Sequence, residues 1–306
     1  MKLKLFLFAL LCFLFLSCDE MEEVYSYSDH FSLYLSNIDG TSNRLIFSDL
    51  VPFSSTYFID NNTKLLIVLN SGEIIELDID SGTKVTYTNG NLSIRNSILS
   101  HDRKKLALIN TGSGNQDVYI FDIITKNFTK MTDTPNYFKR GVSFSNDDSK
   151  LLYTIVKPNY AAIESITLST GVINEITRNT SLNYTSLPFY YPVYGTNDST
   201  VYYLLVEYVT PSSLRSTNNE LLDTLSIINF GLTFSGSNGF LVYERSNYPA
   251  SVIACNTIQH TNLELTTVTY AGGMTNISED GVNVLLGTNN GYSNEFWFRN
   301  TATFAF

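Results

Sequence analysis

The stretch Ser145–Thr177, with the sequence SNDDSKLLYTIVKPNYAAIESITLSTGVINEIT, contains the pattern that decides the fold. A polar turn at Ser145–Lys150 precedes the apolar residues Leu151–Tyr153, and a later turn, Ser169–Gly171, follows the strand-like run Ile163–Thr167. Asn, Asp and Gly tolerate the left-handed backbone angles of tight turns, which most other residues resist. The stretch therefore predicts short strands joined by tight polar turns.

The same turn signature recurs along the chain. It precedes a short apolar strand at five further places: Asp60–Lys64, Ser100–Lys104, Thr196–Thr200, Ser235–Gly239 and Ser278–Gly281. Taken at residues 61, 102, 147, 198, 238 and 280, the six turns are separated by 41, 45, 51, 40 and 42 residues. A second hairpin follows several of these first strand pairs, and no convincing amphipathic helix interrupts them. Four strands in about 40–45 residues is the period of a β-propeller blade.

The repeat also resembles that of a known family. A Ser-x-Asp turn before an apolar strand, with a later strand ending in Asp before a second turn, is similar to the TolB-like, or WD40-like, propeller repeat. The resemblance covers most of residues 31–300, is clearest at Ser100–Thr132 and Ser145–Thr177, and is degraded at Thr196 and Ser235. The Gly-His and Trp-Asp pairs of WD40 blades are missing, and the only tryptophan is Trp297. The resemblance implies an all-β propeller, with a large β-sandwich as the alternative.

The two ends of the repeat region predict how the propeller closes. Phe31–Phe47 looks like a second hairpin without a first strand pair before it. The last turn, at Asp280, begins a repeat that is cut short at Phe306. The two remnants would complete one blade, and such closure removes exposed sheet edges. We therefore expect six four-stranded blades with a ring closed by N- and C-terminal strands. Seven blades remain the alternative, because Glu295–Phe298 could pair within its own blade.

The N-terminus resembles the signal of a bacterial lipoprotein. Lys2 and Lys4 precede the apolar run Leu5–Leu16, which is shorter than the roughly 20 residues that span a bilayer. The small residue Ser17 stands directly before Cys18, as in a lipobox, although Phe15 occupies a position where leucine is usual. We expect residues 1–17 to be a signal peptide and Cys18 to be the lipidated residue. An ordinary signal peptide cut nearby, or an uncleaved membrane helix, is the alternative.

Residues 18–30 predict an acidic tether ahead of the propeller domain at 31–306. In the run Asp19–Glu23, every residue except Met21 is acidic, and apolar residues do not recur at a regular spacing. It also resembles the surface-export signal of Bacteroidota lipoproteins, while retention in the periplasm is the other interpretation. The sequence therefore predicts a cell-envelope protein that is lipid-anchored to the outer membrane and faces either the periplasm or the cell surface.

Charge and cysteine content exclude some classes of partner. Without residues 1–18 the chain has 17 basic and 29 acidic residues, a formal charge of −12. Binding to nucleic acid or to anionic head groups needs clustered Lys and Arg, so we expect neither, and membrane attachment only through the N-terminal lipid. Cys255 is the only cysteine after residue 18, so no intramolecular disulfide can form there, and it is expected to be a small buried side chain.

The loops that join the second and third strands of each blade should gather on one face. They are predicted at Asn70–Gly72, Asn110–Asp117, Lys157–Ala162, Glu207–Asp223, Arg245–Ser251 and Thr288–Asn294. Glu207–Asp223 would be the longest, and long loops are often functional. Tyrosine offers a flat ring with a polar tip at low entropic cost. The predicted protein- or glycan-binding residues are Tyr137, Arg140, Tyr160, Tyr208, Tyr248 and Tyr292, although tyrosine, with 20 copies, could simply cover loop bases.

Catalysis finds little support in the sequence. His30, His101 and His260 fall in different repeats without the spacing of metal ligands. Propeller lyases that hold a metal by several histidines resemble this fold, but the matching histidines are missing. There is also no Gly-x-Ser-x-Gly elbow. We expect no cofactor, no metal and no catalytic residue. A carbohydrate-active propeller enzyme with a converging carboxylate pair, or a structural subunit of an envelope complex, is the alternative.

Overall fold

The prediction of an all-β chain is confirmed. The computed structural model describes residues 31–37, 42, 44–90, 92–112, 116–134, 136–180, 190–195, 198–205, 212–218, 220–225, 235–237, 240–245, 250–256, 261–268, 274–277 and 283–289. Within these ranges, every regular secondary-structure element is a β-strand. Accordingly, this part of the chain contains no helix long and apolar enough to cross a bilayer. Residues 1–30, with the expected signal peptide, Cys18 and tether, lie outside it.

The described strands form six four-stranded antiparallel sheets. Five of them use four consecutive strands each: β3 (Phe53–Ile59), β4 (Lys64–Leu69), β5 (Ile74–Asp78) and β6 (Lys84–Tyr87); β7 (Ile94–Leu99), β8 (Lys105–Asn110), β9 (Val118–Asp122) and β10 (Phe128–Lys130); β11 (Phe138–Phe144), β12 (Lys150–Lys157), β13 (Tyr160–Thr167) and β14 (Ile173–Asn179); β15 (Tyr190–Tyr194), β16 (Val201–Leu205), β17 (Ser212–Ser216) and β18 (Leu221–Leu225); β19 (Ser235–Ser237), β20 (Phe240–Arg245), β21 (Ala250–Asn256) and β22 (Thr261–Val268).

The sixth sheet combines strands from both ends of the described chain. Its order is β2-β1-β24-β23, from β1 (Phe31–Asn37), β2 (Arg44–Asp49), β23 (Met274–Ile277) and β24 (Asn283–Asn289). β1 pairs with β24 along its whole length, from Phe31 opposite Asn289 to Asn37 opposite Asn283. The N-terminal hairpin therefore completes a sheet that the C-terminal strands begin.

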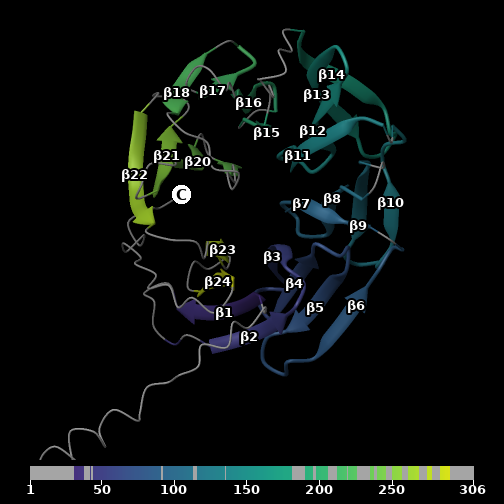
Figure 1. Cartoon of the computed structure of the whole chain (residues 1–306), viewed down its shortest axis with the longest axis vertical. Helices are drawn as coiled ribbons and strands as arrows, with labels where there is room; N and C mark the ends of the chain where they lie inside the picture. Colours follow the sequence, from purple (N-terminus) through teal and green to yellow (C-terminus); the bar gives the residue numbers. More distant parts are fainter. Residues whose placement is uncertain are drawn as a thin grey trace, which may run out of the picture.

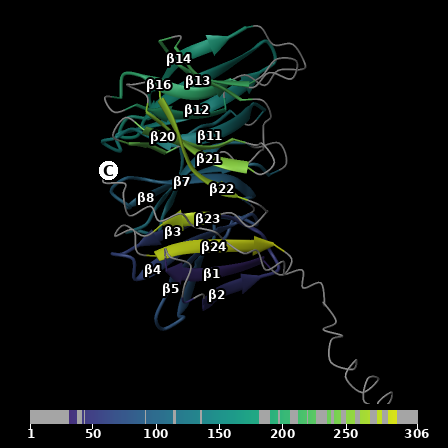
Figure 2. The ribbon, with the colours of Figure 1, turned by 90° about the vertical axis from the view of Figure 1, so that its left-hand side faces the viewer.

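The six sheets lie around a common centre, with β3, β7, β11 and β15 nearest to it and β6, β10 and β14 at the periphery (Figure 1). In the side view the strands cross the thickness of the molecule (Figure 2). Each sheet therefore has two ends. We call the end where the second and third strands join the loop end, and the opposite end, with the repeated polar turns, the turn end.

The repeated Ser-x-Asp sequence forms a hydrogen-bonded turn. Ser145 Oγ donates to Asp147 Oδ1 at 2.7 Å and accepts from the Lys150 amide at 2.9 Å, while the Ser149 amide donates to Asp147 at 3.0 Å. Ser100 and Asp102 make the same bonds one repeat earlier. Hydrogen bonds from Ser145 and Ser149 hold the pKa of Asp147 at about 2. The turn therefore has a structural reason for its serine and its aspartate.

A second aspartate in the turn joins neighbouring sheets. Asp148, with φ of +55°, accepts from the amides of His101 and Asp102 in the preceding sheet at 2.9 and 2.8 Å. Asp198, with φ of +54°, accepts in the same way from the amide of Asn146 at 3.0 Å. Left-handed residues favour Asn, Asp and Gly, so the turn chemistry also places these carboxylates against the next sheet.

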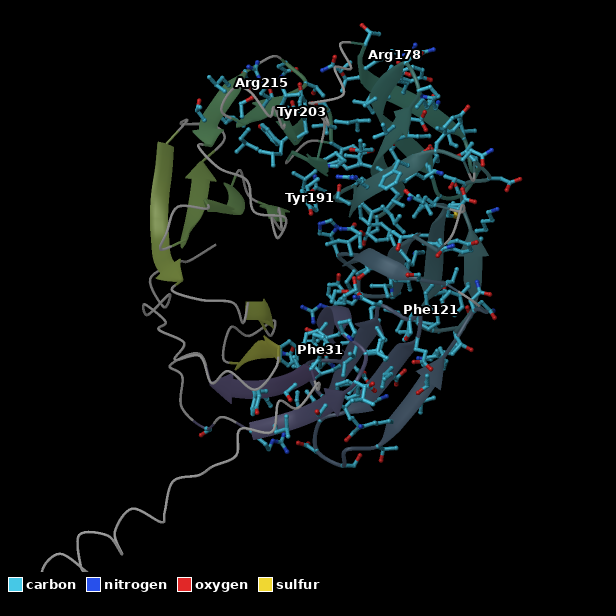
Figure 3. The ribbon with its side chains drawn as sticks, in the orientation of Figure 1. Phe31, Phe121, Arg178, Tyr191, Tyr203 and Arg215 are labelled. Atoms are coloured by element: carbon cyan, nitrogen blue, oxygen red, sulfur yellow. The ribbon has the colours of Figure 1, made fainter. Side chains whose placement is uncertain are left out.

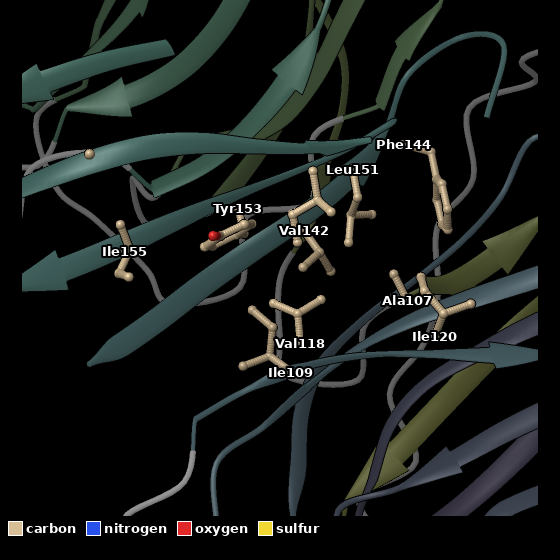
Figure 4. Close-up of a cluster of buried hydrophobic side chains, with 11 residues drawn as sticks. Ala107, Ile109, Val118, Ile120, Val142, Phe144, Leu151, Tyr153 and Ile155 are labelled. Atoms are coloured by element: carbon tan, nitrogen blue, oxygen red, sulfur yellow. The ribbon is translucent and has the colours of Figure 1, made fainter. Parts of the chain in front are cut away.

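Apolar side chains fill the space between adjacent sheets. Between the β7–β10 and β11–β14 sheets, eleven buried residues form one cluster: Ala107, Ile109, Val118, Ile120, Val142, Phe144, Leu151, Tyr153, Ile155, Ala162 and Ile166 (Figure 4). Similar clusters lie at the other described junctions of consecutive sheets, up to β15–β18. The strand patterns are consistent with burial on both faces, because the last five residues of β4 and of β8 are all buried.

The predicted bounds of two loops are wrong. Glu207–Asp223 contains strand β17 and the start of β18 rather than one long loop, and Lys157–Ala162 shrinks to Pro158–Asn159 between β12 and β13. The β17 segment Ser212–Ser216 is rich in serine, yet Ser213, Leu214 and Ser216 are buried between other strands. Small hydroxyl side chains fit such a position, so polar composition misled the assignment.

Replacing Asp148 by alanine is expected to lower the free energy of unfolding by about 1.5–3 kcal/mol, because two backbone amides of the neighbouring turn lose their charged acceptor. Chemical denaturation would measure the change. Asp80→Ala, at an exposed turn position, is the matched control and should leave stability nearly unchanged. Equal stability of the two variants would contradict the role of Asp148.

Acid should remove the contribution of Asp147 in a defined pH window. Its pKa falls from 3.8 to about 2 on folding, so its contribution is complete above about pH 4 and is lost as pH falls through 2. Asp147→Asn should melt at a lower temperature at pH 7 and should lose less of its stability than the unmodified chain between pH 4 and pH 2. Thermal melts across this range would test it, and parallel curves for the two proteins would contradict it.

Candidate functional site

At the loop end of the β11–β14 sheet, one lysine lies between two of the predicted tyrosines. Lys157 ends β12, and its Nζ lies 5.7 Å from the ring centre of Tyr137 and 5.1 Å from that of Tyr160, which begins β13. Both rings are half-buried. Burial disfavours the Lys157 ammonium, but its interactions with Tyr160 and Glu164 outweigh that effect, so its pKa lies above the usual value.

Arg178, near the end of β14, extends this group outwards. Its Cζ lies 4.0 Å from the centre of the Tyr160 ring, close enough for a cation–π contact. The guanidinium also holds Glu175 through two atoms, Nε at 2.9 Å and Nη2 at 2.6 Å, and this pairing lowers the pKa of Glu175. Arg178 lies at the outer edge of the sheet (Figure 3). We call Tyr137, Lys157, Tyr160 and Arg178 the outer cluster.

A buried carboxylate supports the outer cluster from below. Glu164 accepts from Lys157 Nζ at 3.2 Å and from the Tyr153 hydroxyl, which lies directly opposite it on the neighbouring strand. Burial and the Glu164 carboxylate together raise the pKa of Tyr153, so its hydroxyl keeps its proton. Glu164 therefore fixes Lys157 from the interior while the tyrosine rings approach the surface.

A fully buried ion pair fastens the same sheet to its neighbour. Lys139 of β11 and Asp117, before β9, are both inaccessible, and Lys139 Nζ lies 3.2 Å from Asp117 Oδ1. Lys139 Nζ also donates to the carbonyls of Gln116 at 2.7 Å and Thr134 at 3.0 Å. Burial lowers the pKa of Lys139. Burial also acts to raise the pKa of Asp117. Hydrogen bonds from the Thr134 amide and from Lys130 have a larger combined effect, so the pKa of Asp117 is lowered.

Arg140 belongs to the opposite face of the β11–β14 sheet. Side chains alternate along β11, so Phe138 and Arg140 face away from Lys139 and towards β15. Arg140 Cζ lies 5.0 Å from the ring centre of Phe138, which is 48% exposed. The structure thus brings Tyr137 and Tyr160 together around Lys157 and sets Arg140 apart from them.

The remaining predicted residues, Tyr208, Tyr248, Tyr292 and Cys18, lie outside the described residues. Sequence reasoning missed Lys157, Arg178 and the Asp117–Lys139 pair. The hairpin Lys-Pro-Asn-Tyr gave a signal for Lys157, because a two-residue turn sets its flanking residues side by side. No local signal joins Asp117 to Lys139. Within the described ranges, no group of three or more His, Cys, Asp or Glu side chains could hold a metal ion.

Solved structures share this architecture. A protein of Agrobacterium tumefaciens assigned to TolB superposes with a TM-score of 0.59 at 14% identity, over 85% of this chain and 98% of that one. The fold is that of a TolB-like β-propeller. TolB from Acinetobacter baumannii matches with a TM-score of 0.54 at 14% identity, over 87% of this chain and 65% of that one.

An oligogalacturonate lyase in complex with manganese also matches, with a TM-score of 0.59 at 11% identity over 84% of this chain and 82% of that one. No protein-family model and no curated protein matches the sequence. At such low identities the structural likeness establishes the fold, and propellers with different activities share it.

Replacing Lys139 by methionine is expected to cost about 3–5 kcal/mol of stability, because Asp117 stays buried without its inaccessible partner and two carbonyls lose a donor. Denaturant unfolding would measure it. The double variant Asp117→Asn/Lys139→Met should recover part of the loss, since it removes the uncompensated charge. If Asp117→Asn lowered the stability of Lys139→Met by as much as it lowers that of the unmodified chain, the two residues would not be coupled. That result would contradict the prediction.

Proposed function

We propose that this chain is a non-catalytic, lipid-anchored propeller of the cell envelope that binds a protein or a glycan through its loop end. In this proposal residues 1–17 are a signal peptide, Cys18 carries the lipid, residues 18–30 are an acidic tether and residues 31–306 form the propeller. The lipoprotein is of the Bacteroidota type and resides at the outer membrane. The ring has six blades and is closed where the N-terminal strands join the C-terminal ones.

The observation that carries the binding proposal is the outer cluster. Two tyrosine rings and two cations from three separate segments meet at the loop end, on a chain with a net charge of −10. Aromatic rings and arginine are the side chains that most often dominate binding surfaces. Glu164 and Glu175 hold the cations in place, so a partner would meet a surface whose rotamers are already fixed.

A carbohydrate-active enzyme is the second candidate. An oligogalacturonate lyase among the structural neighbours favours it, because the same fold there performs chemistry on a sugar polymer. In this chain the buried carboxylates at the loop end, Asp117 and Glu164, are each held by lysine and hydroxyl groups, and these contacts support a structural role for them. Depolymerisation of an added oligosaccharide by the purified protein would favour the enzyme.

The variant Tyr137→Ala/Tyr160→Ala tests the binding proposal. It should reduce capture of the partner from detergent-solubilised envelopes by roughly tenfold or more, since each anchor tyrosine at a binding surface is worth about 1–2 kcal/mol. Quantitative pull-down with immobilised protein would measure it. Tyr34→Ala, which changes a half-buried tyrosine of another sheet, is the control and should capture normally. Undiminished capture by the double variant, with its fold intact by circular dichroism, would refute the outer cluster as the site.

A further inference from the structure

The innermost strands carry β-bulges at matching places. The pairing of the first strand with the second shifts register between Phe53 and Ser55 in β3, between Ile94 and Asn96 in β7, and between Arg140 and Val142 in β11. β15 shifts between Tyr190 and Val193. Bulges bend a strand and re-aim its side chains, and they are often found beside functional sites.

At two neighbouring bulges the backbone is left-handed, but only one of them uses glycine. Gly141 of β11 has φ of +51°, and a Cβ at that position would come within 2.8 Å of the Tyr191 Cα. Tyr191 of β15 has φ of +49°. For a bulky residue this conformation costs about 1–3 kcal/mol, and such strain is concentrated at binding and catalytic sites. The backbone strain at Tyr191 is therefore a feature typical of a binding site.

Three residues of different chemistry lie beside this bulge. Phe138 is half-exposed, and the Arg140 guanidinium lies over its ring. Tyr191 lies on the central side of the sheets (Figure 3), and although burial raises the pKa of its hydroxyl, the nearby Arg140 charge acts in the opposite direction. We call Phe138, Arg140 and Tyr191 the inner cluster. It lies on the opposite face of the β11–β14 sheet from the outer cluster.

A buried hydroxyl adds a second, independent sign of a ligand. Thr154 stands directly opposite Arg140 in the β11–β12 register, is fully buried, and its Oγ1 has no hydrogen-bond partner in the described part of the chain. Buried polar atoms are almost always paired, so each exception needs a reason. Directly opposed residues share one face of the sheet, which places this hydroxyl beside the root of the arginine side chain.

We propose that the inner cluster binds a small organic anion that carries an aromatic or apolar body. The Arg140 guanidinium offers a planar fork of donors that suits a carboxylate, and the Tyr191 and Thr154 hydroxyls add donors beside it. The exposed Phe138 ring offers the apolar surface against which the body of the ligand packs. This site is additional to the partner surface of the outer cluster and does not depend on it.

Benzoate, an anion on an aromatic ring, is the probe that tests the inner cluster, and benzyl alcohol is its uncharged counterpart. Saturation-transfer NMR on the full chain should show benzoate binding in the millimolar range and much weaker binding of benzyl alcohol. Arg140→Met should weaken benzoate binding by roughly tenfold through loss of the charged fork, and Arg140→Lys should recover only part of it. Arg44→Met, which changes an exposed arginine outside both clusters, is the control and should bind benzoate normally.

The outcomes separate this site from the outer cluster. Benzoate binding that survives in Tyr137→Ala/Tyr160→Ala would support an independent inner site, whatever that variant does to partner capture. Equal binding of benzoate and benzyl alcohol, no binding of benzoate to the unmodified chain, or full binding by a folded Arg140→Met variant would each overturn the proposal. Thermal melts of the two Arg140 variants check folding, and Arg140→Lys carries the test if Arg140→Met fails to fold.

Discussion

Packing of each twisted sheet against the next is the constraint on which the rest of this structure depends. A four-stranded sheet with apolar residues on both faces, as in the segments of β4 and β8, cannot bury them alone. Neighbouring sheets supply the cover, and the turn carboxylates Asp148 and Asp198 fix how consecutive sheets meet at the turn end. The core and its borders are thus shared between sheets rather than contained within one of them.

This sharing explains where the candidate site lies. At the loop end, the apolar cluster between two sheets gives way to the buried pair of Asp117 and Lys139, and then to the half-buried rings of Tyr137 and Tyr160. Buried charges are tolerated at such a depth when they are paired and hydrogen-bonded, as Lys139 is with Asp117 and two backbone carbonyls. A surface whose side chains are held by this buried ion pair can bind a partner with little loss of conformational entropy.

The β11–β14 sheet presents different chemistry on its two faces. One face sends Lys139, Lys157 and Glu164 towards the preceding sheet, whereas the other sends Phe138 and Arg140 towards β15. Strand alternation alone produces this division, because successive residues point to opposite faces. A single sheet therefore contributes to two distinct surfaces, the outer cluster at the periphery and the inner cluster nearer the centre.

The sequence by itself determined the strands, the polar turns and their period, because turn formation depends on neighbours within about five residues, as Ser145, Asp147 and Lys150 show. It misassigned Glu207–Asp223, since serine suits a loop and a tight inner strand equally well. The tertiary structure alone decided that Asp117 meets Lys139, and that the face of β11 carrying Arg140 packs towards β15 rather than towards Tyr160. Both arrangements depend on how one sheet packs against the next, which residues that are neighbours in the sequence do not determine.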